Sequence, residues 1–162
     1  LTTNSGNSIY IGCEEECNEW ERCTNISQDF FGFEMACRPK LKLYTSHGNW
    51  SGELNVLDES GNIHLYQLEN LKSITQGLQT ISIDFPEYGS TNELILNFIN
   101  SETLEFTIND MVYDPHVQSN VLYNGTGQLI HTGGSADTVL EFNCDFTFEN
   151  KNYSVSFSAS RY

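Results

Sequence analysis

The sequence VLEFNCDFTFENKNYSVSFSAS, residues 139–160, shows most clearly which class of fold this chain adopts. Apolar and polar residues alternate through residues 139–148, and the alternation resumes at 153–159 after the short polar link of residues 149–152. The apolar positions of the first segment, which would share one face of a strand, are Leu140, Phe142, Cys144, Phe146 and Phe148. A period of two is typical of a half-buried strand, so the two segments predict an antiparallel hairpin.

The same alternation recurs upstream of this hairpin, in segments separated by turn residues such as those at 58–62 and 100–102. The predicted strands cover residues 41–45, 50–56, 63–65, 81–85, 94–98, 104–108, 121–129, 139–148 and 153–159. About eight or nine short strands, with turns roughly every 8–12 residues, are typical of a sandwich or a barrel. We predict an all-β, jelly-roll-like antiparallel sandwich, with an eight-stranded calycin-like barrel as the alternative.

The tripeptide Gly48-Asn49-Trp50 resembles the short G-x-W signature that opens the first barrel strand of lipocalins. The resemblance covers three residues and the approximate number of strands that follow them. It implies an eight-stranded up-and-down barrel that carries a small apolar ligand. A buried Trp that opens a strand of another β fold is the alternative explanation of Trp50.

The cysteines indicate the compartment in which the chain folds. Four of the five, Cys13, Cys17, Cys23 and Cys37, fall within the first 37 residues, and Cys144 lies far from them. Such clustering in a β-rich chain favours disulfides formed outside the reducing cytosol. Zinc is the alternative, but the C-x3-C-x5-C-x13-C spacing lacks the CxxC pairs of structural zinc sites. Five cysteines cannot all pair within one chain, so one thiol has no internal partner. Either Cys144 is buried and free, or Cys144 is bonded to the cluster and one clustered cysteine bonds another molecule.

The first 40 residues are predicted to form an extension stapled by disulfides onto the β domain of residues 41–162. Within it, CEEECNEWERC, residues 13–23, predicts a short helix, because Glu is a good helix former and no Gly or Pro interrupts the segment. Cys13 and Cys17 would share one face of this helix. We expect each of them to pair with a different cysteine, because neighbours on a helix face meet disulfide geometry poorly.

The charge and hydropathy of the chain argue against nucleic-acid binding and against a membrane-spanning helix. The net charge is −15, from 22 acidic and 7 basic residues, so nucleic acid is a poor partner. No stretch reaches the about 18–20 apolar residues of a membrane helix. The chain starts at Leu1, and we expect an exported product whose signal lay upstream.

Candidate modification and ligand sites are few. The N-x-S/T sequons make Asn25, Asn49, Asn124 and Asn152 candidate N-glycosylation sites. Weak Ca²⁺ binding is a candidate role for three acidic segments, residues 14–21, 58–62 and 109–114, although none has a loop of converging ligands. We predict no cofactor, no metal centre and no catalytic residue, since the histidines at 47, 64, 116 and 131 stand outside recognisable motifs.

We therefore predict a non-enzymatic extracellular module, located at the cell surface or secreted, that binds a protein partner or itself. In the self-associating form, Ile9, Tyr10 and Ile11 are an assembly arm that adds a strand to a neighbouring subunit's open sheet edge. Two alternatives are a carrier of a small apolar ligand in a barrel and an acidic protein that sequesters a basic protein partner. A secreted hydrolase with a carboxylate pair is the least supported alternative.

Overall fold

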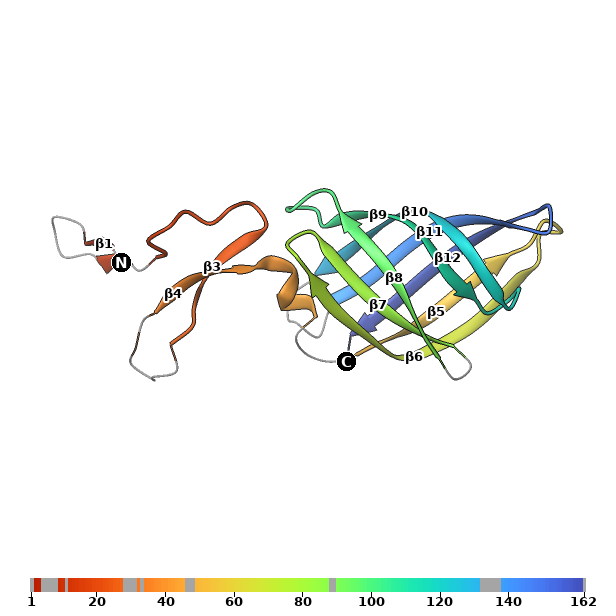
Figure 1. The fold of residues 1–162 in the computed structure, drawn as a ribbon, viewed down its shortest axis with the longest axis horizontal. Coiled ribbons are helices and arrows are strands. Elements are labelled where there is room, and N and C mark those ends of the chain that lie inside the picture. Colours follow the sequence, from red (N-terminus) through yellow and green to blue (C-terminus); the bar gives the residue numbers. More distant parts are fainter. Residues whose placement is uncertain are drawn as a thin grey trace.

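The computed structural model describes residues 2–3, 9–10, 12–27, 32, 34–45, 49–87, 90–131 and 138–161. Eight long strands form a closed barrel (Figure 1). They are β5 (Trp50–Leu57), β6 (Ile63–Gln76), β7 (Thr80–Glu87), β8 (Ser90–Phe98), β9 (Glu105–Asp114), β10 (Ser119–His131), β11 (Thr138–Phe148) and β12 (Lys151–Arg161). Before the barrel come two short pairs and a 3-10 helix: β1 (Thr2–Thr3) with β2 (Ile9–Tyr10), β3 (Glu21–Asn25) with β4 (Met35–Pro39), and η1 (Lys40–Tyr44).

The barrel is an up-and-down meander, in which each strand pairs antiparallel with the next and β12 closes on β5. The closing pair sets Phe157 opposite Leu54 and Val155 opposite Val56. The predicted sandwich is therefore wrong, and the closed eight-stranded antiparallel barrel matches the alternative prediction, a calycin-like barrel, more closely. Both folds show the same inward–outward alternation along each strand, so the pattern alone does not separate them.

The middle of the barrel is filled by aromatic side chains. Phe142 and Phe157 stack with their ring centroids 4.9 Å apart, and both are buried. Phe106, on β9, is also fully buried, and a Cβ atom at Gly127 would collide with its ring. Glycine at this position of β10 therefore lets the ring fill the interior.

One end of the barrel, which we call the closed end, is covered by η1. Leu41 of this helix is fully buried, and Nη1 of Arg161 donates a hydrogen bond of 2.9 Å to the carbonyl oxygen of Leu43. Trp50 opens β5 here, as the lipocalin resemblance implies, and its Nε1 donates to Oγ of Ser73 at 2.9 Å. Residues 41–45, which were predicted to be a strand, instead supply the apolar Leu41 that seals this end, and Gly48 lies outside the described residues.

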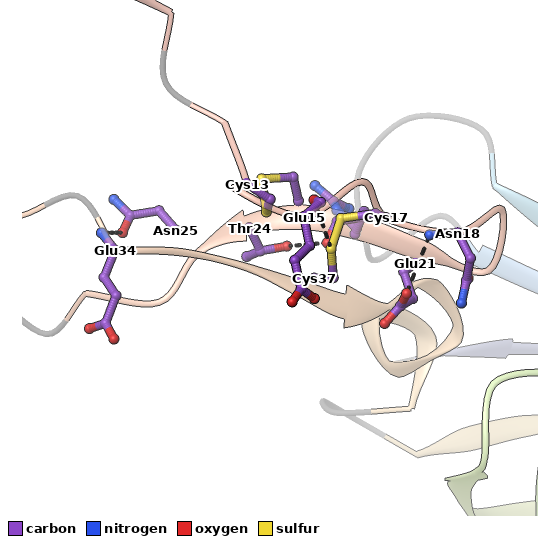
Figure 2. The surroundings of a disulfide bond; sticks show 11 residues. Cys13, Glu15, Cys17, Asn18, Glu21, Thr24, Asn25, Glu34 and Cys37 are labelled. Carbon is purple, nitrogen blue, oxygen red and sulfur yellow. Dashed lines mark hydrogen bonds between the residues drawn. A yellow bond between two sulfur atoms is a disulfide. The ribbon is translucent and has the colours of Figure 1, made fainter. Parts of the chain in front are cut away.

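The extension is a disulfide-linked β hairpin, and the predicted helix over 13–23 is wrong. Bonds Cys13–Cys23 and Cys17–Cys37 tie the segment to β3 and β4, and Figure 2 shows Cys13, Cys17 and Cys37 gathered beside the hairpin. Asn18 also bends the chain, because its Oδ1 accepts a hydrogen bond from the Trp20 amide. These cross-links confirm the predicted disulfides and the expectation that Cys13 and Cys17 do not pair together, and they exclude the zinc alternative for these thiols. Both bonds lie within the extension and Cys144 is free and buried, so the prediction that disulfides staple the extension onto the β domain is wrong.

Figure 1 shows the β3–β4 hairpin beyond the orange coil of η1, outside the barrel. The turn that precedes β3 nevertheless reaches the barrel, because the Trp20 side chain is buried in the main core. Oγ of Ser101, in the β8–β9 turn, also donates a hydrogen bond of 3.4 Å to Glu19. The extension therefore belongs to the closed end of the barrel.

A cavity at the open end as the candidate functional site

The barrel end away from η1, which we call the open end, carries the β5–β6, β7–β8, β9–β10 and β11–β12 turns. A bulge midway along β6 marks where this strand separates from β7 toward the open end. The β5–β6 register shifts between Trp50–Leu71 and Gly52–Leu68, and Asn70 has a φ of 58°. The β6–β7 ladder covers only residues 72–76 of β6. The first half of β6 therefore pairs with β5 and not with β7, while β7 continues beside β8. A bulge inserts one unmatched residue and bends its strand, which explains this divergence.

A second split lies between β8 and β9. Their ladder consists of the pairs Asn97–Thr107 and Phe98–Phe106. Beyond them, Oδ2 of Asp110 accepts a hydrogen bond of 3.1 Å from the Ile95 amide. A side-chain carboxylate thus replaces a backbone acceptor of the ladder. The distal half of the β7–β8 hairpin therefore lies between two gaps in the barrel wall.

A cavity of about 520 Å³, which we call the open-end cavity, lies among the strands in this half of the barrel. Its lining is mainly apolar and aromatic and comes from β5, β6, β7, β9, β10 and the turn after β9. The described residues that line it are Leu54, Leu65, Tyr66, Gln67, Leu68, Glu69, Phe85, Val112, Tyr113, Pro115 and Tyr123. A cavity of roughly 300–1,000 Å³ with apolar walls and a few polar groups is typical of a small-molecule site.

A chain of hydrogen bonds and stacked rings links the turns around this cavity. Nε2 of His64 donates to Oδ2 of Asp58 at 2.9 Å, and the His64 ring stacks on His116 with centroids 4.1 Å apart. Nδ1 of His116 and the hydroxyl of Tyr66 share a hydrogen bond of 2.8 Å. The hydrogen bond from His64, followed by backbone amides, lowers the pKa of Asp58. The β5–β6 and β9–β10 turns are thereby connected through side chains.

A buried carboxylate lies behind the cavity wall. Oδ2 of Asp114 accepts a hydrogen bond of 2.6 Å from the hydroxyl of Tyr123, and Oδ1 accepts from the amides of His116 and Val117 at 2.9 and 3.1 Å. Asp114 is fully buried, and burial followed by the charge of Asp114 raises the pKa of Tyr123. The arrangement holds the β9–β10 turn and places a negative charge beside the cavity.

The predicted modification and assembly residues lie apart from the cavity lining. Asn124 and Asn152 are exposed on barrel strands, Asn25 is exposed at the end of β3, and Asn49 is half-buried before β5. Ile9 and Tyr10 pair with Thr3 and Thr2 of the same chain, and Ile11 lies outside the described residues. Glycosylation and self-association remain predictions.

The acidic segments do not form a converging ligand set. Among the described residues, one group of three metal-ligating side chains has its ligand atoms within 4.8 Å of one another, Cys13, Cys17 and Cys23, and all three are in disulfides. Asp58, which was a candidate for weak Ca²⁺ binding, instead accepts hydrogen bonds from its own turn and from His64. Weak Ca²⁺ binding remains a prediction without a geometric site in the described chain.

Sequence reasoning missed the residues that build the cavity. His64 and His116 meet only because β6 and the β9–β10 turn lie at the same barrel end. In the sequence, Asn70 and Asp110 look like ordinary strand or turn residues. Their contribution to the gaps in the barrel wall depends on the strands that lie next to them in the fold. The Gly48-Asn49-Trp50 tripeptide was the one signal in the sequence, and it implied a ligand carrier without locating the site.

Comparison of the chain with models of protein families, with curated proteins and with solved structures found no match. Within the described residues, no helix has the length and apolar character needed to cross a membrane. The role of the open-end cavity is therefore assigned from its own lining, charges and hydrogen bonds.

Proposed function

We propose that this protein binds a small, largely apolar molecule in the open-end cavity and acts outside the cytosol. The observation that carries the proposal is a cavity of about 520 Å³ at a barrel mouth, lined mainly by Leu, Val, Phe and Tyr side chains. Leu65, at the rim, is more than half exposed, as is Ile63 near it on β6. Covering such apolar surface with a ligand is favourable by about 25 cal/mol per Å².

The filled middle of the barrel sets the depth of the site. Phe106, Phe142 and Phe157 occupy the interior between the two ends, so a ligand would enter from the open end and stop above them. Two disulfides in the extension favour an oxidising compartment, which supports an extracellular location. The binding function and the location are separate parts of the proposal.

Titration with N-phenyl-1-naphthylamine, a neutral dye that fluoresces in apolar surroundings, tests the binding function. We expect saturable binding with one site per chain. Leu68→Trp should abolish it, because Leu68 lines the cavity and an indole would occupy the space. The matched control is Ile74→Trp, an exposed position on the same strand that does not line the cavity, which should bind as the unaltered protein does. Equal binding by both variants, or none by the unaltered protein, would overturn the proposal.

A further inference from the structure

We infer that the molecule held in the open-end cavity is a cation, an apolar or aromatic body that carries a protonated amine. This inference rests on the proposed function and names its ligand class. Three independent features of the described residues support it: a buried carboxylate without a cationic partner, the distribution of charge along the barrel, and the aromatic lining.

The first feature is Asp114. Its oxygens act purely as acceptors, from the Tyr123 hydroxyl and from two amides, which is the role of an ionised carboxylate. No Lys, Arg or His side chain among the described residues forms an ion pair with it, although it is fully buried. Burying a charge without an opposite charge is unfavourable. A cation in the adjacent cavity, against Tyr123, would offset that cost.

The second feature is the acidic excess of the open half of the barrel. Five of the seven basic residues lie in the extension, in η1 or at the closed end: Arg22, Arg38, Lys40, Lys42 and Arg161. In the open half the described Lys and Arg residues are Lys72, which stands opposite Asp84 in the β6–β7 ladder, and Lys151, whereas the acidic residues described there are Asp58, Glu59, Glu69, Asp84, Glu93, Asp110, Asp114, Asp145 and Glu149. The resulting potential attracts cations and repels carboxylates.

The third feature is the aromatic lining. Tyr66, Phe85, Tyr113 and Tyr123 are among the residues that line the cavity, and so is the exposed Glu69. A cation over an aromatic face is stabilised by about 0.5–2 kcal/mol, more as water is excluded. The same rings accommodate the apolar body of the ligand, so one site serves both parts.

An anionic ligand finds little to hold it here. Among the described residues, the buried side-chain donor without a partner in this half is Nδ2 of Asn92, which stands opposite Phe85 in the β7–β8 ladder. A single neutral donor suits a hydroxyl or carbonyl oxygen, whereas a desolvated carboxylate needs a cation or several donors.

Isothermal titration with three probes of equal chain length tests the inference: decylammonium, decanol and decanoate, at pH 7 and low salt. We expect decylammonium to bind about tenfold more tightly than decanol, and decanoate to bind most weakly. Decanol binding as tightly as decylammonium, or more tightly, would overturn the inference and leave the proposed function standing. Failure of all three probes would overturn the proposed function itself.

Two variants locate the effect. Asp114→Asn should remove most of the preference for decylammonium over decanol while decanol affinity is retained. Because Asp114 also holds a turn, Glu69→Lys provides a test at an exposed position on the cavity edge, where we expect weaker decylammonium and stronger decanoate binding. Glu141→Lys makes the same charge change on the exposed outer side of β11, away from the cavity. Equal effects of the two lysine variants would mean that only net charge matters and would overturn the inference.

Discussion

The two ends of the barrel are built from the same eight strands and differ in what closes them. At the closed end, Leu41 of η1 and Trp50 of β5 are buried together with Trp20 of the extension. Toward the open end, beyond the bulge at Asn70 and the hydrogen bond of the Asp110 side chain, the strands part and leave a cavity. The closed meander thus supplies a packed frame at one end, while local irregularities along its strands leave a cavity toward the other.

The largest expected effect is a difference in the stability lost when the same substitution is made at each end of the barrel. Leu41→Ala should destabilise the protein by about 3 kcal/mol, because a fully buried leucine is replaced by a void. Leu68→Ala, the same change on the cavity wall, should cost only about 1 kcal/mol, because Leu68 is half-buried and already borders open volume. Urea unfolding of both variants measures the difference, and equal losses would show that the ends do not differ in packing.

A smaller effect concerns the pH response of the open end. The pKa of Asp58 lies below its ordinary value of 3.8, chiefly because of the hydrogen bond from His64. The ionised carboxylate therefore stabilises the fold above about pH 3.8, and this contribution is lost as pH falls through the lower folded pKa.

In His64→Ala, NMR titration of the Asp58 carboxyl carbon should show its pKa rising toward the ordinary value. His131→Ala, at the closed end, is the control and should leave it unchanged. An unchanged pKa in His64→Ala would mean that the amides of Ser60 and Asn62, which also donate to Asp58, hold the charge by themselves.

The smallest expected effect is an absence of reaction. Cys144 is free and buried, and burial, with a lesser contribution from Asp145, raises the pKa of its thiol to about 12. Because the thiolate is the reactive form, iodoacetamide at pH 8 should leave the folded protein unmodified and should alkylate one thiol after denaturation. Rapid modification of the folded protein, located to Cys144 by peptide mass spectrometry, would contradict the prediction and show that the reagent reaches a reactive thiolate in the folded state.

Predictions from the sequence succeeded where neighbouring residues decide the structure. The hairpin of residues 139–160 forms as β11 and β12, since alternation along each strand reflects its own two faces. The helix predicted over 13–23 failed, although the glutamates favour it, because disulfides Cys13–Cys23 and Cys17–Cys37 impose another path. Local propensity is weak compared with a covalent cross-link.

By itself, the sequence determined that the chain is β-rich, acidic and able to form disulfides, because these follow from composition and from a period of two. The closure of the strands into a barrel depends on tertiary structure, because β5 and β12, the first and last strands of the barrel, pair with each other. Leu54 and Phe157, for example, stand opposite each other in this pair. The site depends even more on tertiary structure. Asn70, Asp110 and Asp114 acquire their roles from strands and turns that lie next to them in space, and no local pattern records which neighbours those will be.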